Sequence, residues 1–299
     1  MKRERAMAKR ILTSIVGLPI LIAIVYIGGI PLQIGLLLLS CVGLSEFYAA
    51  LKNSAPRFSD SKIIEFPIRG KRGLIRHMSV NNIGYIFTAL YYLLLPHVAN
   101  TAYFFILITM FIISLMVIMV FFHGKVNIMD CADALFGFFY TSFLMSFIYL
   151  IRVRDLGEYF VWFVFITAFG CDSCAYFIGR AFGRHKLAPE LSPNKTIEGA
   201  VGGIAGAGVL SMLFGMLISR MFHLEDIDAL IYFALVGVVG AVFSTFGDLA
   251  ASSVKRYTRI KDFGKIFPGH GGVLDRFDSV IFAAPMIYMA ILLLQLNRG

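Results

Sequence analysis

The chain has 299 residues, of which 59% are hydrophobic and only 15% are charged, with a mean hydropathy of +0.80 and a net charge of +9. An ordinary soluble domain is about 45–50% apolar and about 25% charged. The composition therefore excludes a soluble enzyme, a disordered regulator and a collagen-like fibre, and it indicates an integral membrane protein.

Apolar stretches recur along the whole chain, and nine of them approach the about 20 residues that a helix needs to span a bilayer. They are residues 11–30, 32–51, 82–98, 102–122, 131–151, 159–181, 196–219, 229–250 and 274–296. We therefore expect an all-α, polytopic transmembrane protein with a retained first span. The first five spans and the basic loop 52–81 would form an N-terminal region, 1–151. The last four would form a catalytic region, 152–299.

Lysine and arginine are distributed unequally between the two sides that nine spans would create. One side, which includes the N-terminus, holds 23 of the 27, and the other holds Arg152, Arg154, Arg220 and Arg298. Basic residues are retained on the cytoplasmic side, so we expect a cytoplasmic N-terminus and an external C-terminus. The loop 52–81 either serves only as this topology signal or also gathers anionic lipid.

Cys171 and Cys174 form a C-x-x-C pair inside the sixth span. Such a pair can bind metal or carry out redox chemistry, but there is no second pair and the six histidines are scattered. We favour the alternative that these are small residues at a helix contact. Glycines 199, 202, 203, 206 and 208 in the next span likewise predict close helix packing.

Ionisable residues inside membrane spans are costly and are therefore candidates for a functional site. If residues 248–256 continue the eighth helix, Asp248, Ser252 and Lys255 lie on one of its faces. Asp275 and Asp278 share a face at the start of the ninth helix by the same spacing. These side chains would meet at the cytoplasmic boundary of the membrane.

This combination of charges suits both a hard cation and an anion. Mg²⁺ prefers one or two carboxylates together with substrate phosphate oxygens, a role that fits Asp248 and Asp275. Four cations remain for phosphate, namely Lys255, Arg256, Lys261 and Arg276. The simpler alternative, that these charges only pair with one another, does not explain the accompanying Pro-Gly-His-Gly-Gly loop. In that loop, His270 either binds the loop backbone or contacts phosphate.

A second polar stretch lies between the sixth and seventh spans. Asp172 falls about two turns inside the span 159–181, where a carboxylate needs a partner or water. Ser192 followed by Pro193 predicts an N-cap and a first helical residue. Lys195 would then lie in the first turn, where a cation opposes the helix dipole unless an anionic ligand binds there.

At these residues the chain resembles the phosphatidate cytidylyltransferases, also called CDP-diacylglycerol synthases. The resemblance is carried by the run Ser252-x-Val-Lys-Arg-x4-Lys-Asp-x-Gly-x2-Phe-Pro-x-His-Gly-Gly-Val-x-Asp-Arg-Phe-Asp278, which matches the family signature at every defined position. Gly247-Asp248 and the stretch from Asp172 to Gly199 are also similar to that family. The specific likeness covers roughly residues 170–280.

The resemblance implies that CTP and phosphatidic acid react to give CDP-diacylglycerol and pyrophosphate, with Mg²⁺ as cofactor; it leaves a second cation open. It also implies a homodimer in the cell (inner) membrane with its site facing the cytoplasm. The metal would be held by Asp248 and Asp275, with Asp278 in or beside the same shell. The matching positions further imply a catalytic or substrate-binding role for Lys255, Arg256, Arg276, Asp172, Ser192, Lys195, Glu198, Ser252, Lys261, His270, Gly271 and Gly272.

Two other functions remain as alternatives. A related cytidylyltransferase could act on another lipid phosphate, such as an ether lipid, because lipid-facing spans carry little information about the head group. An anion transporter would favour polar residues near the bilayer midplane and an inverted repeat between its halves. The sequence has no such repeat, and its charges lie at one boundary.

Overall fold

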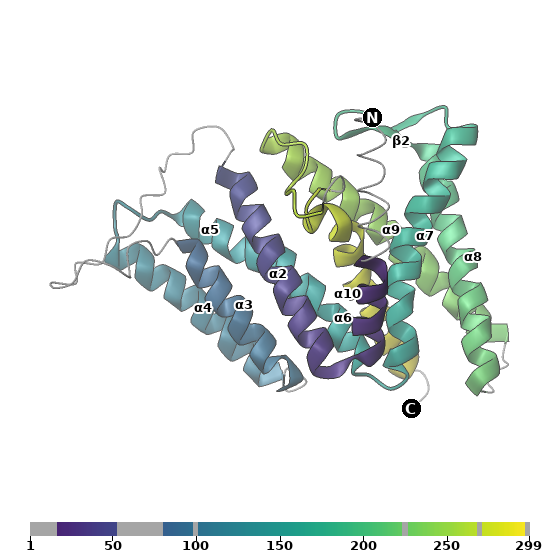
Figure 1. The fold of residues 1–299 in the computed structure, drawn as a ribbon, viewed down its shortest axis with the longest axis horizontal. Coiled ribbons are helices and arrows are strands. Elements are labelled where there is room, and N and C mark those ends of the chain that lie inside the picture. The colour runs from purple at the N-terminus through teal and green to yellow at the C-terminus, as the bar shows by residue number, and fades with distance from the viewer. Residues whose placement is uncertain (1–16, 53–79, 98–100, 223–226, 268–270, 297–299) are drawn as a thin grey trace.

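The computed structural model describes residues 17–52, 80–97, 101–222, 227–267 and 271–296, and nearly all of them are helical (Figure 1). In chain order the elements are a helix at Gly17–Ile27, α2 (Gly29–Lys52), α3 (Val80–Leu94), η1 (Leu95–His97), α4 (Thr101–Phe121), α5 (Ile128–Gly137), η2 (Phe138–Phe143), α6 (Leu144–Arg152), α7 (Gly157–Phe182), β1 (Lys186–Ala188), β2 (Ser192–Thr196), α8 (Ile197–Phe222), α9 (Ile227–Tyr257) and α10 (Leu274–Leu296).

Seven of the described helices are long and apolar enough to cross a membrane. One of them, Ile128–Arg152, combines α5, the π-helical segment η2 and α6. The remaining two predicted stretches are occupied by shorter helices, Gly17–Ile27 and α3. The prediction of an all-α, polytopic membrane protein is therefore confirmed. The count of nine spans and the opposite placement of the termini stay predictions.

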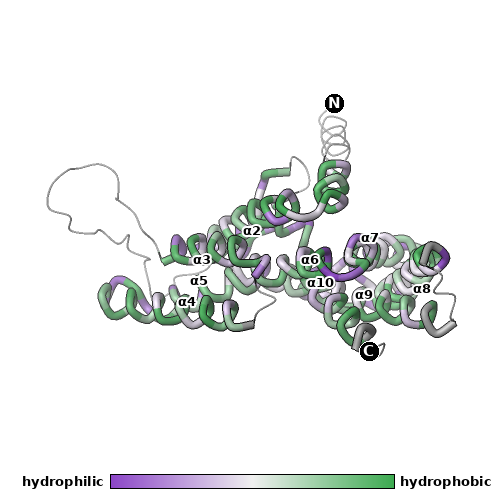
Figure 2. Tube along the Cα trace, turned by 90° about the horizontal axis from the view of Figure 1, so that it is seen from below, coloured by the Kyte–Doolittle hydropathy of each residue, from purple (hydrophilic) through white to green (hydrophobic). Residues whose placement is uncertain are grey.

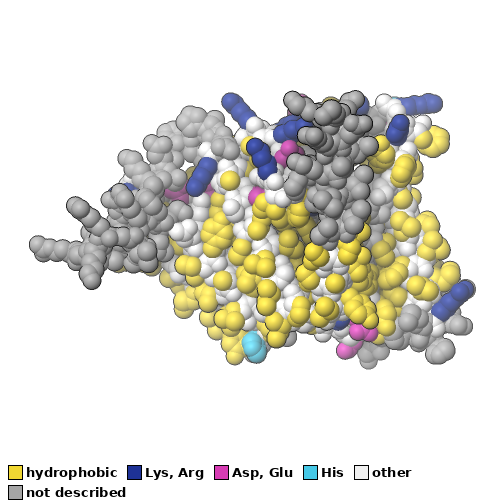
Figure 3. All heavy atoms as spheres, viewed as in Figure 1, with side chains coloured by type: hydrophobic (Ala, Val, Ile, Leu, Met, Phe, Trp, Pro, Cys, Tyr) yellow, Lys and Arg dark blue, Asp and Glu magenta, His cyan; other side chains and the backbone are white. Residues whose placement is uncertain are grey.

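The helices lie side by side, with α2 to α5 at one end of the molecule and α7 to α9 at the other (Figure 1). The segments between these two groups are α6 and α10, and α10 packs against both α6 and α9. Hydrophobic residues dominate along the helices (Figure 2). In a space-filling view, apolar side chains cover the flank, and most visible Lys and Arg side chains gather along one edge (Figure 3).

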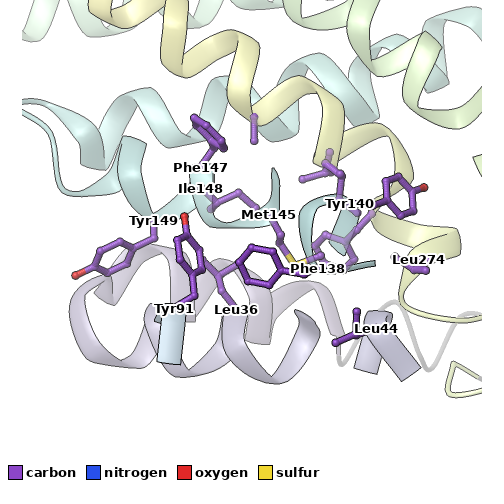
Figure 4. Close-up of a cluster of buried hydrophobic side chains, with 14 of the residues drawn as sticks. Leu36, Leu44, Tyr91, Phe138, Tyr140, Met145, Phe147, Ile148, Tyr149 and Leu274 are labelled. Atoms are coloured by element: carbon purple, nitrogen blue, oxygen red, sulfur yellow. The ribbon is translucent and has the colours of Figure 1, made fainter. Parts of the chain in front are cut away.

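The largest buried cluster joins α2, α3 and the α5–η2–α6 run (Figure 4). Tyr91, Phe138 and Met145 are completely buried in it. Its tyrosine hydroxyls find partners on neighbouring helices: the Tyr91 hydroxyl lies 2.7 Å from the Ser146 hydroxyl, and the Tyr92 hydroxyl lies 2.8 Å from that of Ser40. Hydrogen bonds of this kind join helices where the bilayer offers no other partner.

Small residues bring α7 and α8 into close contact. A Cβ added to Gly203 would lie 2.8 Å from the Cβ of Ala175 and 3.1 Å from the sulfur of Cys171. A Cβ added to Gly206 would lie 2.8 Å from the Cβ of Cys174. Both cysteines are free thiols packed against these glycines. The prediction of close packing is confirmed for the glycines and for the C-x-x-C pair.

Candidate active site

The predicted site residues gather at one end of the helix layer. The end of α9, the start of α10, the β1–β2 hairpin and the start of α8 all lie there (Figure 1). This is also the edge at which basic side chains collect in Figure 3. Four segments of the C-terminal half thus come together where candidate membrane-spanning helices begin or end.

The polar face of α9 forms as predicted, because the helix continues to Tyr257 without interruption. The Ser252 hydroxyl donates a hydrogen bond of 3.4 Å to Oδ1 of Asp248, one turn earlier. Lys255 lies a further turn along and reaches across to α10. The i, i+4, i+7 spacing therefore places a carboxylate, a hydroxyl and an ammonium group in a row.

Asp275 ties α9, α10 and the intervening loop together. Its Oδ1 accepts a hydrogen bond of 2.9 Å from Nζ of Lys255. Its Oδ2 accepts hydrogen bonds from the backbone N–H groups of Phe263, at 2.8 Å, and Gly272, at 3.0 Å. The Asp275 side chain is only 5% exposed and that of Lys255 only 16%. The hydrogen-bonding needs of this buried carboxyl group are therefore well satisfied.

The predicted helix start at Ser192 and Pro193 is wrong. Residues Ser192–Thr196 form strand β2, which pairs antiparallel with β1, and α8 begins only at Ile197. The N-cap is Thr196, whose Oγ1 accepts a hydrogen bond of 3.1 Å from the backbone N–H of Gly199. A proline is compatible with this ribbon because both of its strands are edge strands.

Lys195 consequently lies in a strand and not in the first turn of a helix. Its ammonium group forms a salt bridge with Oδ2 of Asp248, and the two side chains are 25% and 26% exposed. The predicted conflict with the helix dipole therefore does not arise. Instead, Lys195 links the hairpin to α9 through Asp248, the first residue of the polar row Asp248, Ser252 and Lys255.

Glu198 binds the residues that directly precede strand β1 of the hairpin. Its carboxylate accepts hydrogen bonds from the backbone N–H groups of Arg184 and His185 and lies 2.6 Å from Nδ1 of His185. Thus Glu198 faces its own hairpin, and its predicted contact with substrate stays a prediction.

Two further carboxylates lie beside this network. The Ser279 hydroxyl donates to Oδ2 of Asp172 at 3.4 Å, and its backbone N–H donates to Oδ1 of Asp278 at 2.8 Å. Asp278 is buried and close enough to Asp172, Asp248 and Lys255 for their charges to interact. Four aspartates from α7, α9 and α10 therefore lie close to one another and to the two lysines that pair with Asp248 and Asp275.

The remaining predicted residues frame the site. Arg256 donates from Nε to the carbonyl oxygen of Leu191 at 3.2 Å, and Lys261 and Arg276 are exposed. Gly271 has a φ of +82°, a left-handed conformation that favours glycine. His270 lies outside the described residues.

Sequence reasoning missed Glu46 and Tyr140. Glu46 is the only Asp, Glu, Lys, Arg or His in the predicted span 32–51, so the cost of charges in a membrane could have singled it out. In the structure it is buried against the loop before α10. Tyr140 lies in η2, and its buried hydroxyl has no hydrogen-bond partner within the described part of the chain. No motif in the sequence indicates that tyrosine.

The chain matches a family model described as the cytidylyltransferase family over residues 8–294. It is similar to the phosphatidate cytidylyltransferase of Staphylococcus haemolyticus, with 31% identity over 97% of this chain and 100% of that protein. It is 41% identical to the enzyme of that name from Bacillus subtilis, over 50% of this chain and 54% of that protein. The match to that of Staphylococcus saprophyticus is 38% identical over 58% and 63%. The latter two matches thus span between half and two thirds of those relatives, whereas the first is full-length. The chain belongs to the cytidylyltransferase family.

Proposed function

We propose that this protein transfers CMP from CTP to phosphatidic acid, giving CDP-diacylglycerol and pyrophosphate. The observation that carries the proposal is the meeting of two Lys–Asp pairs, Lys195–Asp248 and Lys255–Asp275, at one end of a bundle of membrane helices. The full-length likeness to a phosphatidate cytidylyltransferase supports it. CTP reaches such a site from water, and phosphatidate remains in the leaflet.

The reaction we infer is an in-line attack of a phosphatidate oxygen on the α-phosphorus of CTP, with pyrophosphate as the leaving group. Both substrates are highly anionic, so catalysis depends mainly on positioning and charge stabilisation. Four cations at the boundary suit this role, namely Lys255, Arg256, Lys261 and Arg276.

Magnesium is part of the proposal. The described residues contain no group of three or more His, Cys, Asp or Glu side chains placed to hold a metal by themselves. Mg²⁺ usually takes only one or two carboxylates and completes its shell with water and substrate phosphates, so the aspartates present fit this ion. Asp248 and Asp275 would hold it, with Asp278 in or beside the same shell, and the bound ion would neutralise charge on the leaving pyrophosphate.

We expect the reaction to need no side-chain general base. The second pKa of a phosphomonoester is about 6, so the attacking oxygen is largely ionised at neutral pH. Replacing His270 by glutamine should therefore leave the shape of the pH–rate curve unchanged, even if the rate falls. Measurement of kcat/KM from pH 5 to 9 checks this. An acid limb present in the wild type and lost in the variant would identify His270 as the base.

We propose that the protein spans the cell membrane nine times and that its site faces the cytoplasm. Epitope tags at the N-terminus and in the loop 52–81 should then be cytoplasmic, and a C-terminal tag external, because 23 of the 27 Lys and Arg residues lie on one side. Protease accessibility in sealed vesicles measures this, with a tag inserted between residues 153 and 156 as an external control. Both termini on one side would contradict nine spans.

The activity is tested with the purified protein in detergent, radiolabelled CTP and phosphatidate. We expect a labelled liponucleotide and released pyrophosphate. An ether-linked lipid phosphate supplied in parallel tests the related cytidylyltransferase activity. The homodimer is part of the proposal, and cross-linking of the purified protein tests it. Absence of any liponucleotide with either lipid, under conditions where the protein is folded, would overturn the proposed function.

A further inference from the structure

Glu46 lies near the end of α2, in the N-terminal half of the chain, and is only 6% exposed. Its two carboxylate oxygens contact the backbone that leads into α10. Oε1 accepts a hydrogen bond of 3.0 Å from the N–H of Val273, and Oε2 accepts one of 2.9 Å from the N–H of Leu274. One buried side chain thus binds two consecutive backbone groups from 227 residues further along the chain.

These contacts cap the N-terminus of α10, whose own N-cap residue has no side-chain acceptor. Val273 is the N-cap of α10, because its carbonyl oxygen accepts hydrogen bonds from the N–H groups of Arg276 and Phe277. Valine has no side-chain acceptor, whereas N-caps are usually Ser, Thr, Asp or Asn. The first N–H groups of a helix need a partner, and a negative charge there is favourable. Glu46 supplies both from another helix.

Two glycines make room for this carboxylate. A Cβ on Gly264 or on Gly272 would collide with Oε1 of Glu46. Neither glycine has a positive φ, so their backbone conformations do not require glycine. Because both positions lie on the loop between α9 and α10, the loop and Glu46 fit closely against each other.

We propose that Glu46 is a positioning residue for the reaction. It binds the backbone N–H of Leu274, which is followed directly by Asp275 and Arg276. Asp275 in turn binds Lys255 and the N–H of Gly272. Displacing Glu46 would therefore shift the group that pairs with Lys255 and the arginine assigned to phosphate. The inference rests on the proposed function, since it assigns Glu46 to that reaction.

The first test replaces Glu46 by glutamine, which keeps the size but puts an amide NH₂ against one backbone N–H. The matched control is Glu158→Gln, because Glu158 is an exposed carboxylate in the first turn of α7. We expect faster hydrogen exchange in peptides covering residues 261–277 for the first variant only. We also expect kcat/KM for CTP to fall about 100-fold, the cost of a misplacement of about 1 Å.

The kinetic constants separate positioning from a merely structural role. Loss of folded protein lowers the apparent kcat but leaves the KM of the surviving molecules unchanged. Misplacement of Arg276 weakens CTP binding, so KM should rise as kcat falls. An unchanged KM, or faster exchange without any kinetic change, would overturn the proposal. A wild-type protein without turnover would instead overturn the proposed function, and the two failures are therefore distinct.

A second test uses Gly264→Ala, which pushes against the Glu46 carboxylate and also serves if Glu46→Gln does not fold. This variant should lower kcat/KM at least about 10-fold in the wild-type background. In the Glu46→Ala background the colliding atoms are gone, so adding Gly264→Ala should lower kcat/KM by less than about threefold. Equal costs in the two backgrounds would show that the glycine and the carboxylate act independently, which contradicts the proposal.

Discussion

Replacing Asp248 by asparagine is expected to lower CDP-diacylglycerol formation at least about 100- to 1,000-fold, the scale on which one electrostatic partner in a site contributes. Asparagine keeps the size of the side chain and an oxygen for the hydroxyl of Ser252. It removes the negative charge that pairs with Lys195 and that would hold Mg²⁺. We therefore expect the variant to lose activity but to remain folded.

The measurement is incorporation of radiolabelled CTP into lipid over a range of Mg²⁺ concentrations, with the unfolding midpoint of each variant recorded in detergent. Asp155→Asn provides the control, since Asp155 is an exposed aspartate in the turn between α6 and α7. Near-normal turnover of Asp248→Asn at limiting Mg²⁺ would show that this carboxylate is not a metal ligand.

Replacing Lys255 by methionine is expected to lower both activity and stability. It leaves the carboxylate of Asp275 without its cation in a nearly buried position. Breaking a buried pair by removing one partner costs about 3–5 kcal/mol in the free energy of unfolding. We expect the lower end, about 3 kcal/mol, because the N–H groups of Phe263 and Gly272 still bind the carboxylate.

Lys195→Met is the matched comparison. The Lys195–Asp248 pair is about a quarter exposed, so its loss should cost less than about 1 kcal/mol of stability while activity still falls. The double variant Lys255→Met/Asp275→Asn should regain most of the stability lost in Lys255→Met, but not the activity. The unfolding midpoints of the wild type, the two single variants and the double variant are measured by thermal unfolding in detergent. A wild-type unfolding midpoint for Lys255→Met would show that the buried pair contributes nothing to the fold.

Much of the site could be predicted because its signals are local. Hydrophobic stretches predict the helices, and the spacing of Asp248, Ser252 and Lys255 fixes their common face once the helix continues. The same holds for Asp275 and Asp278 at the start of α10. Each of these inferences depends only on residues within two or three turns of one another.

The rest depends on contacts between distant segments. Ser192-Pro193 satisfies the local preferences of a helix start, but pairing with β1 makes it a strand, and Thr196 takes over as the cap. The salt bridge of Lys195 follows from that hairpin and could not be foreseen without it. Glu46 illustrates the limit best, because its function as a cap is visible only once Val273 is placed beside it.

The contact between Glu46 and Val273 also has a consequence for biosynthesis. A ribosome adds about 5–20 residues per second, so the 227 residues between them take roughly 10–45 s to make. During that interval α2 carries an ionisable group without the backbone donors that later bind it. The nascent chain must therefore keep α2 near polar head groups, water or the insertion machinery until α10 arrives. The burial of Glu46 in α2 is therefore completed only once α10 has been synthesised.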